Sequence, residues 1–163
     1  MLELGVSSGG SISALAARTS RLIYGFDWFY GLPEAWDEGA VGDPAGSYST
    51  AGVLPNLPDN CVLVVGLVQN TLRSFLANHP DPVAFVHFDL DLYSATSFAL
   101  MALNRRLAHG AILLFDEMVL RPRNLAHEGT AFCEFLTATN YAAEYLGQSH
   151  SESMIFRLLT APT

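Results

Sequence analysis

Cysteines are scarce in this sequence, and basic residues are outnumbered by acidic ones. Only Cys61 and Cys133 occur among 163 residues; the first begins an expected strand and the second lies in an expected helix. We therefore expect reduced, partly buried thiols in a cytoplasmic chain. The 8 basic and 16 acidic residues give a net charge of −8. This balance argues against a nucleic-acid backbone or an anionic membrane surface as partner.

Long hydrophobic runs are also missing. The longest, residues 62–68, is far shorter than the roughly 20 residues of a membrane span. The N-terminus has no basic region of the kind that begins a signal peptide. Half of the residues are nevertheless hydrophobic and the mean hydropathy is +0.27. This is enough for the buried core of one domain over residues 1–163.

Two apolar segments that end in acidic residues organise the sequence. Residues 83–91 are VAFVHFDLD and residues 111–117 are AILLFDE. Such runs are typical of strands buried on both faces. As neighbours in one sheet, they would bring Asp89, Asp91, Asp116 and Glu117 to the edge where open α/β sheets bind ligands. Carboxylates crowded in this way repel one another unless protons, a cation or a cationic substrate offsets their charge.

A glycine-rich turn follows the first expected strand, residues 1–6, and precedes a helix over residues 12–18. The pattern Glu3-x-Gly5-x-x-x-Gly9 permits a tight turn and close approach of a ligand. It is not the G-x-G-x-x-G of dinucleotide folds. A second strand, residues 21–27, ends in Asp27, which is 27 − 3 = 24 residues after Glu3. Doubly wound folds place a ribose-binding carboxylate at about this offset; an ordinary turn and a capping Asp are the alternatives.

A long connection follows the second strand. Trp28, Phe29 and Tyr30 come first, and these aromatics could wall an adenine or a substrate, or belong to the core. Residues 34–60 contain four glycines and three prolines. We expect a loop with one short helix near residues 49–54. A connection of this length is a candidate lid.

Strands and helices alternate through the remainder. Strands are expected over residues 61–66, 83–91 and 111–117, and helices over residues 69–78, 94–108 and 128–138, with Gly110 ending the second helix. Residues 141–146 and 153–159 are expected to form a final antiparallel pair of strands. This alternation predicts an α/β, Rossmann-like fold with a mostly parallel sheet and helices on both faces.

Five segments between Leu2 and Glu117 carry a family resemblance: LELGVSSGGS, YGFDWFYGLP, VVGLVQNTL, HFDLDLYSAT and GAILLFDE. The chain resembles the class I S-adenosylmethionine-dependent methyltransferases, specifically the TylF-like macrocin and mycinamicin sugar O-methyltransferases. The resemblance implies S-adenosylmethionine as cofactor, Mg²⁺ assistance, and a small-molecule hydroxyl, on a sugar or another vicinal diol, as acceptor. That family has helices before its first strand. The first strand expected here begins at Met1, so the resemblance implies a domain that lacks those covering helices in the given sequence: a fragment, a chain with a misassigned start, or a minimal form with an open site.

The resemblance also implies roles for individual residues. Those implied to bind or border the cofactor are Glu3, Gly5, Ser7, Ser8, Gly9, Asp27, Trp28, Gly66, Leu67 and Asp89. Those implied to coordinate the metal are Asp89, Asp116 and Glu117, where the family usually has Asp-Asp for the last pair. Asp89 or His87 would take the proton of the acceptor hydroxyl. Strand alternation places His87 on the face of Asp89, but it also fits a core histidine.

Two other functional classes are compatible with these residues. One is a non-catalytic methyltransferase-like domain that binds the cofactor or a partner. The other is a metal-dependent hydrolase that uses the same carboxylates, although the glycine turn with Asp27 argues against it. An open cleft with exposed Trp28 and Phe29 would also favour a homo-oligomer.

Overall fold

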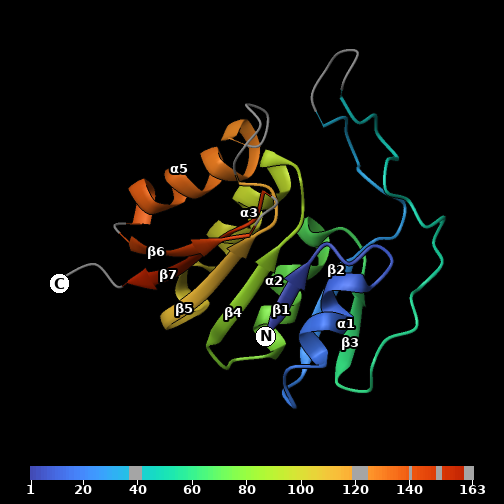
Figure 1. The fold of residues 1–163 in the computed structure, drawn as a ribbon, viewed down its shortest axis with the longest axis horizontal. Coiled ribbons are helices and arrows are strands. Elements are labelled where there is room, and N and C mark those ends of the chain that lie inside the picture. Colours follow the sequence, from blue (N-terminus) through green and yellow to red (C-terminus); the bar gives the residue numbers. More distant parts are fainter. Residues whose placement is uncertain (37–41, 119–124, 140, 150–151, 160–163) are drawn as a thin grey trace.

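Seven strands form one sheet in the computed structural model, which describes residues 1–36, 42–118, 125–139, 141–149 and 152–159. The strand order is β3-β2-β1-β4-β5-β7-β6 (Figure 1). The first five are parallel, and β7 is antiparallel to both β5 and β6. Their bounds are β1 Leu2–Leu4, β2 Ile23–Asp27, β3 Cys61–Val65, β4 Val83–Phe88, β5 Leu107–Phe115, β6 Ala142–Gln148 and β7 Met154–Leu159.

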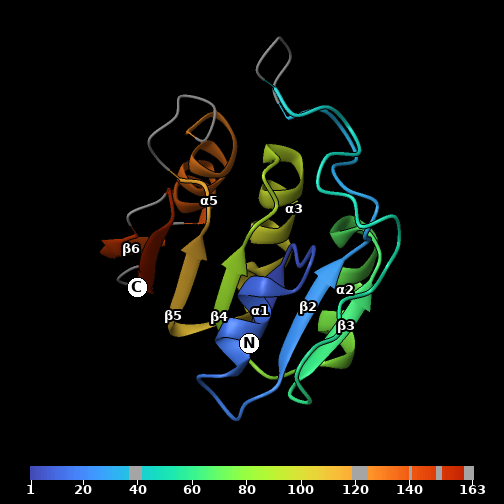
Figure 2. The same ribbon diagram turned by 45° about the vertical axis from the view of Figure 1, so that its right-hand side comes forward.

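Helices cover both faces of this sheet. Helix α1 (Gly10–Ala16) lies on one face, and α2 (Val68–Asn78), α3 (Tyr93–Leu103) and α5 (Thr130–Thr139) lie on the other (Figure 2). A 3₁₀ turn, η1 (Asn104–Arg106), follows α3, and a π-helical turn, η2 (Leu125–Gly129), precedes α5. No helix in the described ranges is long and apolar enough to cross a membrane. The expected Rossmann-like fold, with its antiparallel C-terminal pair, is confirmed.

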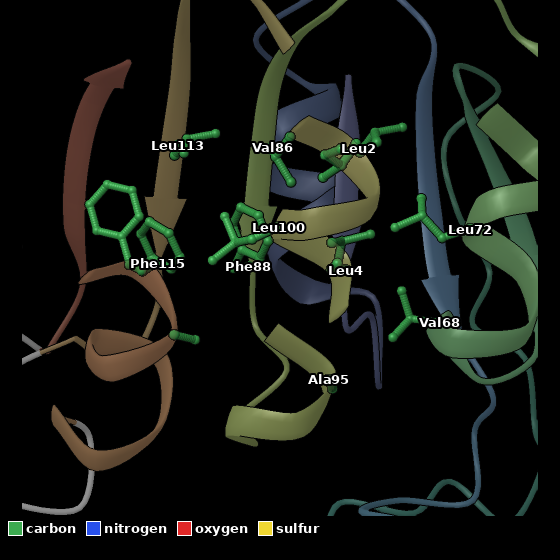
Figure 3. Packing of buried hydrophobic residues seen from close by; sticks show 14 of the residues in the cluster. Leu2, Leu4, Val68, Leu72, Val86, Phe88, Ala95, Leu100, Leu113 and Phe115 are labelled. Carbon is green, nitrogen blue, oxygen red and sulfur yellow. The ribbon is translucent and has the colours of Figure 1, made fainter. Parts of the chain in front are cut away.

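The larger hydrophobic core lies between the sheet and helices α2, α3 and α5 (Figure 3). Leu4, Phe88 and Phe115 are paired across β1, β4 and β5 and are each 0% exposed. The rings of Phe88 and Phe115 stack with centroids 4.7 Å apart. Each side chain of this kind contributes about 1.5–3 kcal/mol on burial. This packing keeps the carboxyl ends of the three strands level.

A smaller core packs α1 onto the other face. Its buried members include Ile12, Ile23 and Phe29. Phe29 is only 1% exposed, so the expectation that it lies open beside the cleft is wrong, and it cannot favour an oligomer. Cys61 is partly buried against this cluster, as expected. Cys133 is exposed and corrects that prediction, because α5 turns its neighbours Ala131, Phe132 and Phe135 toward the core.

Several elements differ from the expectations. The helix expected to reach residue 108 ends at Leu103, and Gly110 lies inside β5. Arg106 donates hydrogen bonds to the carbonyls of Leu76 and His79, which turns the chain back toward the sheet. The short helix expected over residues 49–54 is absent from these described residues, because Ala51 and Gly52 have φ angles of 54° and 78°. Strand β4 ends at Phe88, before the acidic residues.

Candidate functional site

One cavity of about 310 Å³ opens at the carboxyl edge of the parallel strands. Its lining includes residues at or just beyond the ends of four different strands: Gly5, Asp27, Gly66 and Asp89. Asp116 and Glu117, which follow β5, complete the acidic side. The acidic ends of β4 and β5 thus share a cavity with the glycine turn, as the sequence predicts. The volume is at the lower end of the range for small-molecule sites.

Gly5 lets the ends of β1 and β4 approach each other. Its φ is +92°, and a Cβ atom added there would lie 1.7 Å from the carbonyl oxygen of Asp89. The amide of Asp89 donates a hydrogen bond of 2.8 Å to the carbonyl of Leu4 just before this point. A side chain at position 5 would therefore force the two loops apart.

Asp27 organises the glycine turn before any ligand binds. Its Oδ2 accepts hydrogen bonds from the amides of Val6 and Ser7, at 2.8 and 2.7 Å, and its Oδ1 accepts from the amide of Phe29 at 2.7 Å. A carboxylate oxygen can accept two hydrogen bonds. Within the described residues Oδ1 has a single donor, so a ribose hydroxyl has an acceptor at this position.

The other residues implied for the cofactor divide into two groups. Ser7, Trp28, Gly66 and Leu67 line the cavity, whereas Ser8, Gly9 and Glu3 do not. Ser8 is exposed. A Cβ atom at Gly9 would lie 2.7 Å from Leu57 Cδ2, so this glycine lets the long connection pack on the turn. Their cofactor roles stay predictions.

Glu3 is buried beneath the cavity in a polar chain that crosses the sheet. It is 0% exposed, and its Oε1 accepts a hydrogen bond of 2.9 Å from the hydroxyl of Ser11. Its Oε2 lies 3.1 Å from His87 Nδ1. On the other side of that ring, Nε2 is 3.9 Å from Asp116 Oδ1, which also accepts a hydrogen bond from Ser153. This row of polar side chains connects α1 to the acidic end of β5.

The imidazole of His87 and the carboxylates on either side of it stabilise one another's charged forms. Burial alone would lower the pKa of His87, but the carboxylates of Asp116 and Glu3 more than offset it and raise the pKa to about 10. At 3.9 Å the contact with Asp116 is an ion pair rather than a hydrogen bond. His87 in turn lowers the pKa of Asp116. A protonated imidazole outside the cavity lining cannot accept a proton there, so this arrangement argues against His87 as the base.

The acidic side of the cavity holds carboxyls that resist ionisation. Burial, and then the charge of Asp116, raises the pKa of Asp89 to about 7. Burial, and then a hydrogen bond with Asp91, raises the pKa of Glu117 to about 10. Asp91 lines the same cavity with a left-handed backbone, φ +61°. Asp91 is therefore part of the cavity wall, at the edge of the sheet where the sequence places it.

The side chains implied as metal ligands are not arranged around a common point in this structure. Asp89, Asp116 and Glu117 all line the cavity, and carboxylate oxygens suit Mg²⁺. However, no three His, Cys, Asp or Glu side chains of the described ranges are grouped so that they could hold an ion. The arrangement therefore does not fit a metal without side-chain movement, and we assign the metal no step.

Two side chains that line the cavity were not expected there, and a third, Glu128, lies behind it. Tyr48, from the long connection, lines the cavity, and burial followed by Asp43 and Asp91 raises its pKa to about 12. Gln69, in the first turn of α2, lines it too, and its buried Oε1 has no hydrogen-bond partner among the described residues. Glu128 is 1% exposed behind the acidic loops. The sequence signal for Tyr48 is its place in the candidate lid. No sequence motif marks Gln69 or Glu128 as part of the site.

The long connection contributes one wall of the cavity. Gly31, Leu32 and Pro33 line it next to Trp28. The amide of Leu32 donates to the carbonyl of Ser47, and the amide of Gly46 donates back to Leu32. The two arms of the connection therefore run side by side, away from the sheet (Figure 1). That it moves as a lid stays a prediction.

Comparison with known proteins identifies the class. The family profile described as "Methyltransferase domain" matches residues 2–118, more than half of the chain. The chain therefore belongs to this methyltransferase family. A comparison with curated proteins finds no match.

Solved structures with the same fold include several methyltransferases. CalS11, a calicheamicin methyltransferase, is 25% identical with a TM-score of 0.75, over 96% of this chain and 71% of that chain. Its apo structure, described as a TDP-rhamnose 3'-O-methyltransferase, is 28% identical with a TM-score of 0.65, over 96% and 70%. The O-methyltransferase NovP is 19% identical with a TM-score of 0.71, over 98% and 72%; at this identity the likeness concerns the fold.

Proposed function

We propose that this protein transfers a methyl group from S-adenosylmethionine to a hydroxyl of a small molecule. One observation carries the proposal: the glycine turn with Asp27 and the acidic ends of β4 and β5 line a single cavity. A nucleoside cofactor and a polar acceptor can therefore meet there. Membership of the methyltransferase family supports the reaction class.

Residues on the glycine-turn side suit a nucleoside. Asp27 Oδ1 would accept a hydrogen bond from a ribose hydroxyl. Gly66 and Leu67 would border the adenine, and the unpartnered Oε1 of Gln69 is an acceptor for its amino group. A buried acceptor without a partner costs about 1–3 kcal/mol, so a ligand donor at Gln69 would recover that free energy. Gly5 and Ser7 would lie against the methionine half.

Residues on the acidic side would handle the acceptor. The cofactor supplies an electrophilic methyl group bound to a sulfonium. The chain's task is to hold the acceptor oxygen in line with it, which can lower the barrier by several kcal/mol, and to remove the hydroxyl proton. Asp89 suits this second task, since it lines the cavity and its pKa of about 7 matches neutral pH. Asp91 lies in the same wall and can orient the hydroxyl.

Calorimetry with S-adenosylhomocysteine tests the cofactor site. Wild-type protein is expected to bind it, and Asp27→Asn to bind it about 100-fold more weakly, because hydrogen bonds to the charged carboxylate contribute about 1.5–3 kcal/mol each. Asp81→Asn, at an exposed aspartate in the turn before β4, is the matched control. Unaltered affinity in a folded Asp27→Asn protein would refute the role of Asp27.

The acceptor is best sought among sugars. The TylF-like resemblance suggests a sugar hydroxyl, and CalS11, the relative at 28% identity, is described as acting on TDP-rhamnose. A panel of nucleotide-linked deoxysugars, glycosides and catechols, with S-adenosylhomocysteine release as the readout, would identify the class. Binding of S-adenosylhomocysteine without turnover on any member would favour the alternative, a non-catalytic domain that binds cofactor or a partner.

Magnesium assistance is a separate part of the proposal. Its support is the crowding of Asp89, Asp116 and Glu117, which a divalent ion would relieve after side-chain rotation. We expect Mg²⁺ at about 100 times its Kd to stabilise the fold by about 2.7 kcal/mol, or roughly 5–10 °C in Tm. EDTA should reverse the shift, and Asp116→Asn should abolish it. An identical Tm with Mg²⁺ and with EDTA would contradict this part alone.

A further inference from the structure

The side chain of Glu128 lies behind the two acidic loops and contacts both. It comes from η2, and it is 1% exposed. Its Oε2 accepts a hydrogen bond of 3.2 Å from the amide of Glu117, and its Oε1 lies 3.5 Å from the amide of Leu90. These two amides belong to the loops after β5 and β4. Glu128 does not line the cavity.

The contacts of Glu128 connect β4 and β5 just beyond the point where their backbone hydrogen bonds end. The amide of Asp116 donates a hydrogen bond of 2.9 Å to the carbonyl of Phe88, at the last paired position of β4 and β5. Beyond this position, the Glu128 carboxyl contacts the amide of Leu90 on one side and that of Glu117 on the other. Figure 2 shows β4 and β5 side by side, with their arrowheads toward the end of the molecule that holds α5. Each of the two carboxyl oxygens of Glu128 contacts one loop, so this side chain fixes the distance between the two loops.

The segment that carries Glu128 is itself fastened to α3. The ring of His127 accepts a hydrogen bond of 3.1 Å, through Nδ1, from the amide of Tyr93, the first residue of α3. The hydroxyl of Tyr93 donates to Glu134 of α5 at 2.5 Å. The ring of Trp36 packs on His127 with centroids 6.2 Å apart. A support held at these points can keep a carboxylate in place.

We propose that Glu128 is a positioning residue: it holds the loops after β4 and β5 at the separation that turns Asp89, Asp91, Asp116 and Glu117 into the cavity. Burial, together with the charges of Asp89 and Asp91, raises the pKa of the Glu128 carboxyl, and the hydrogen bonds from the amides of Glu117 and Leu90 oppose that shift. A buried carboxyl group is costly unless its acceptor capacity is used. Bridging two main-chain donors uses it. The catalytic part of this inference rests on the proposed methyl transfer, but the bridge itself does not.

Amide hydrogen exchange measured by NMR tests the bridge directly. In Glu128→Leu, the amides of Leu90 and Glu117 are expected to exchange about tenfold faster, while those of Val86 and Leu113 inside the strands keep their rates. Glu144→Gln, at an exposed glutamate of β6, is the matched control. Unchanged exchange at both loop amides would overturn the proposal.

A second variant covers the case in which Glu128→Leu does not fold. The single amide oxygen of Glu128→Gln can replace only one of the two carboxylate oxygens, so one of the two loop amides should lose protection. If both amides in Glu128→Gln were as well protected as in the wild type, the proposed bridge would be overturned.

Kinetics test whether the bridge positions the catalytic groups. With an acceptor that the wild type methylates, kcat of Glu128→Gln should fall about tenfold or more, while its affinity for S-adenosylhomocysteine stays within about threefold. Faster exchange with unchanged kcat would reduce Glu128 to a structural role. Failure of the wild type to bind S-adenosylhomocysteine would instead defeat the methyl-transfer function and leave the exchange result standing.

Discussion

Gly5→Ala is expected to destabilise the protein by about 3 kcal/mol and to abolish cofactor binding. The added methyl carbon would lie 1.7 Å from the Asp89 carbonyl oxygen, in a backbone with φ +92°. Overpacking of this kind costs about 1–3 kcal/mol, and a left-handed φ adds about 1–2 kcal/mol. The chain must separate β1 from β4 at the point where the glycine turn meets the acidic loop. Thermal unfolding should show a Tm lower by roughly 6–12 °C.

A second glycine separates the two causes. Gly46 has a similar φ of +88°, but a Cβ atom there would meet nothing within 4 Å. Gly46→Ala should therefore cost only the backbone term, about 1 kcal/mol. Equal losses in Gly5→Ala and Gly46→Ala would contradict the close contact with Asp89.

His87→Leu is expected to lower the free energy of unfolding by about 3–5 kcal/mol. The substitution leaves the carboxylate of Glu3, which is 0% exposed, with the hydroxyl of Ser11 as its remaining side-chain contact in the described structure. An uncompensated buried charge is among the most destabilising changes a point substitution can make. Urea denaturation of the variant beside the wild type measures the loss.

The double variant Glu3→Leu with His87→Leu tests whether the loss belongs to the pair. Replacing both partners by apolar residues removes the unpaired charge, so the double variant should lose less than the sum of the two single variants. Additive losses within about 0.5 kcal/mol would show that the two side chains do not interact.

The pair also predicts how stability depends on pH. The pKa of His87 rises from 6.5 to about 10 on folding, so its stabilising contribution is fully present below pH 6.5 and is lost as the pH rises through 10. In His87→Leu this component of the pH dependence should be missing.

Local patterns were enough to predict the fold and the edge of the sheet that carries the site. The apolar segments that end in Asp89 and Asp116 specify buried strands, and the glycine turn before α1 specifies a crossover. Parallel strands must then end at one edge, which brings the carboxylates and Asp27 to one cavity. These properties depend on periodicity and backbone freedom, which neighbouring residues along the chain determine.

Tertiary structure alone decided which side chains meet. Glu3 and His87 are 84 residues apart, and they touch because β1 and β4 pair in one register. The same holds for Glu128, which is 38 residues from Leu90 and 11 from Glu117, and for Phe29, which α1 buries. No spacing in the sequence encodes such contacts, since they arise from the packing of whole elements and from the free energy of burying charge.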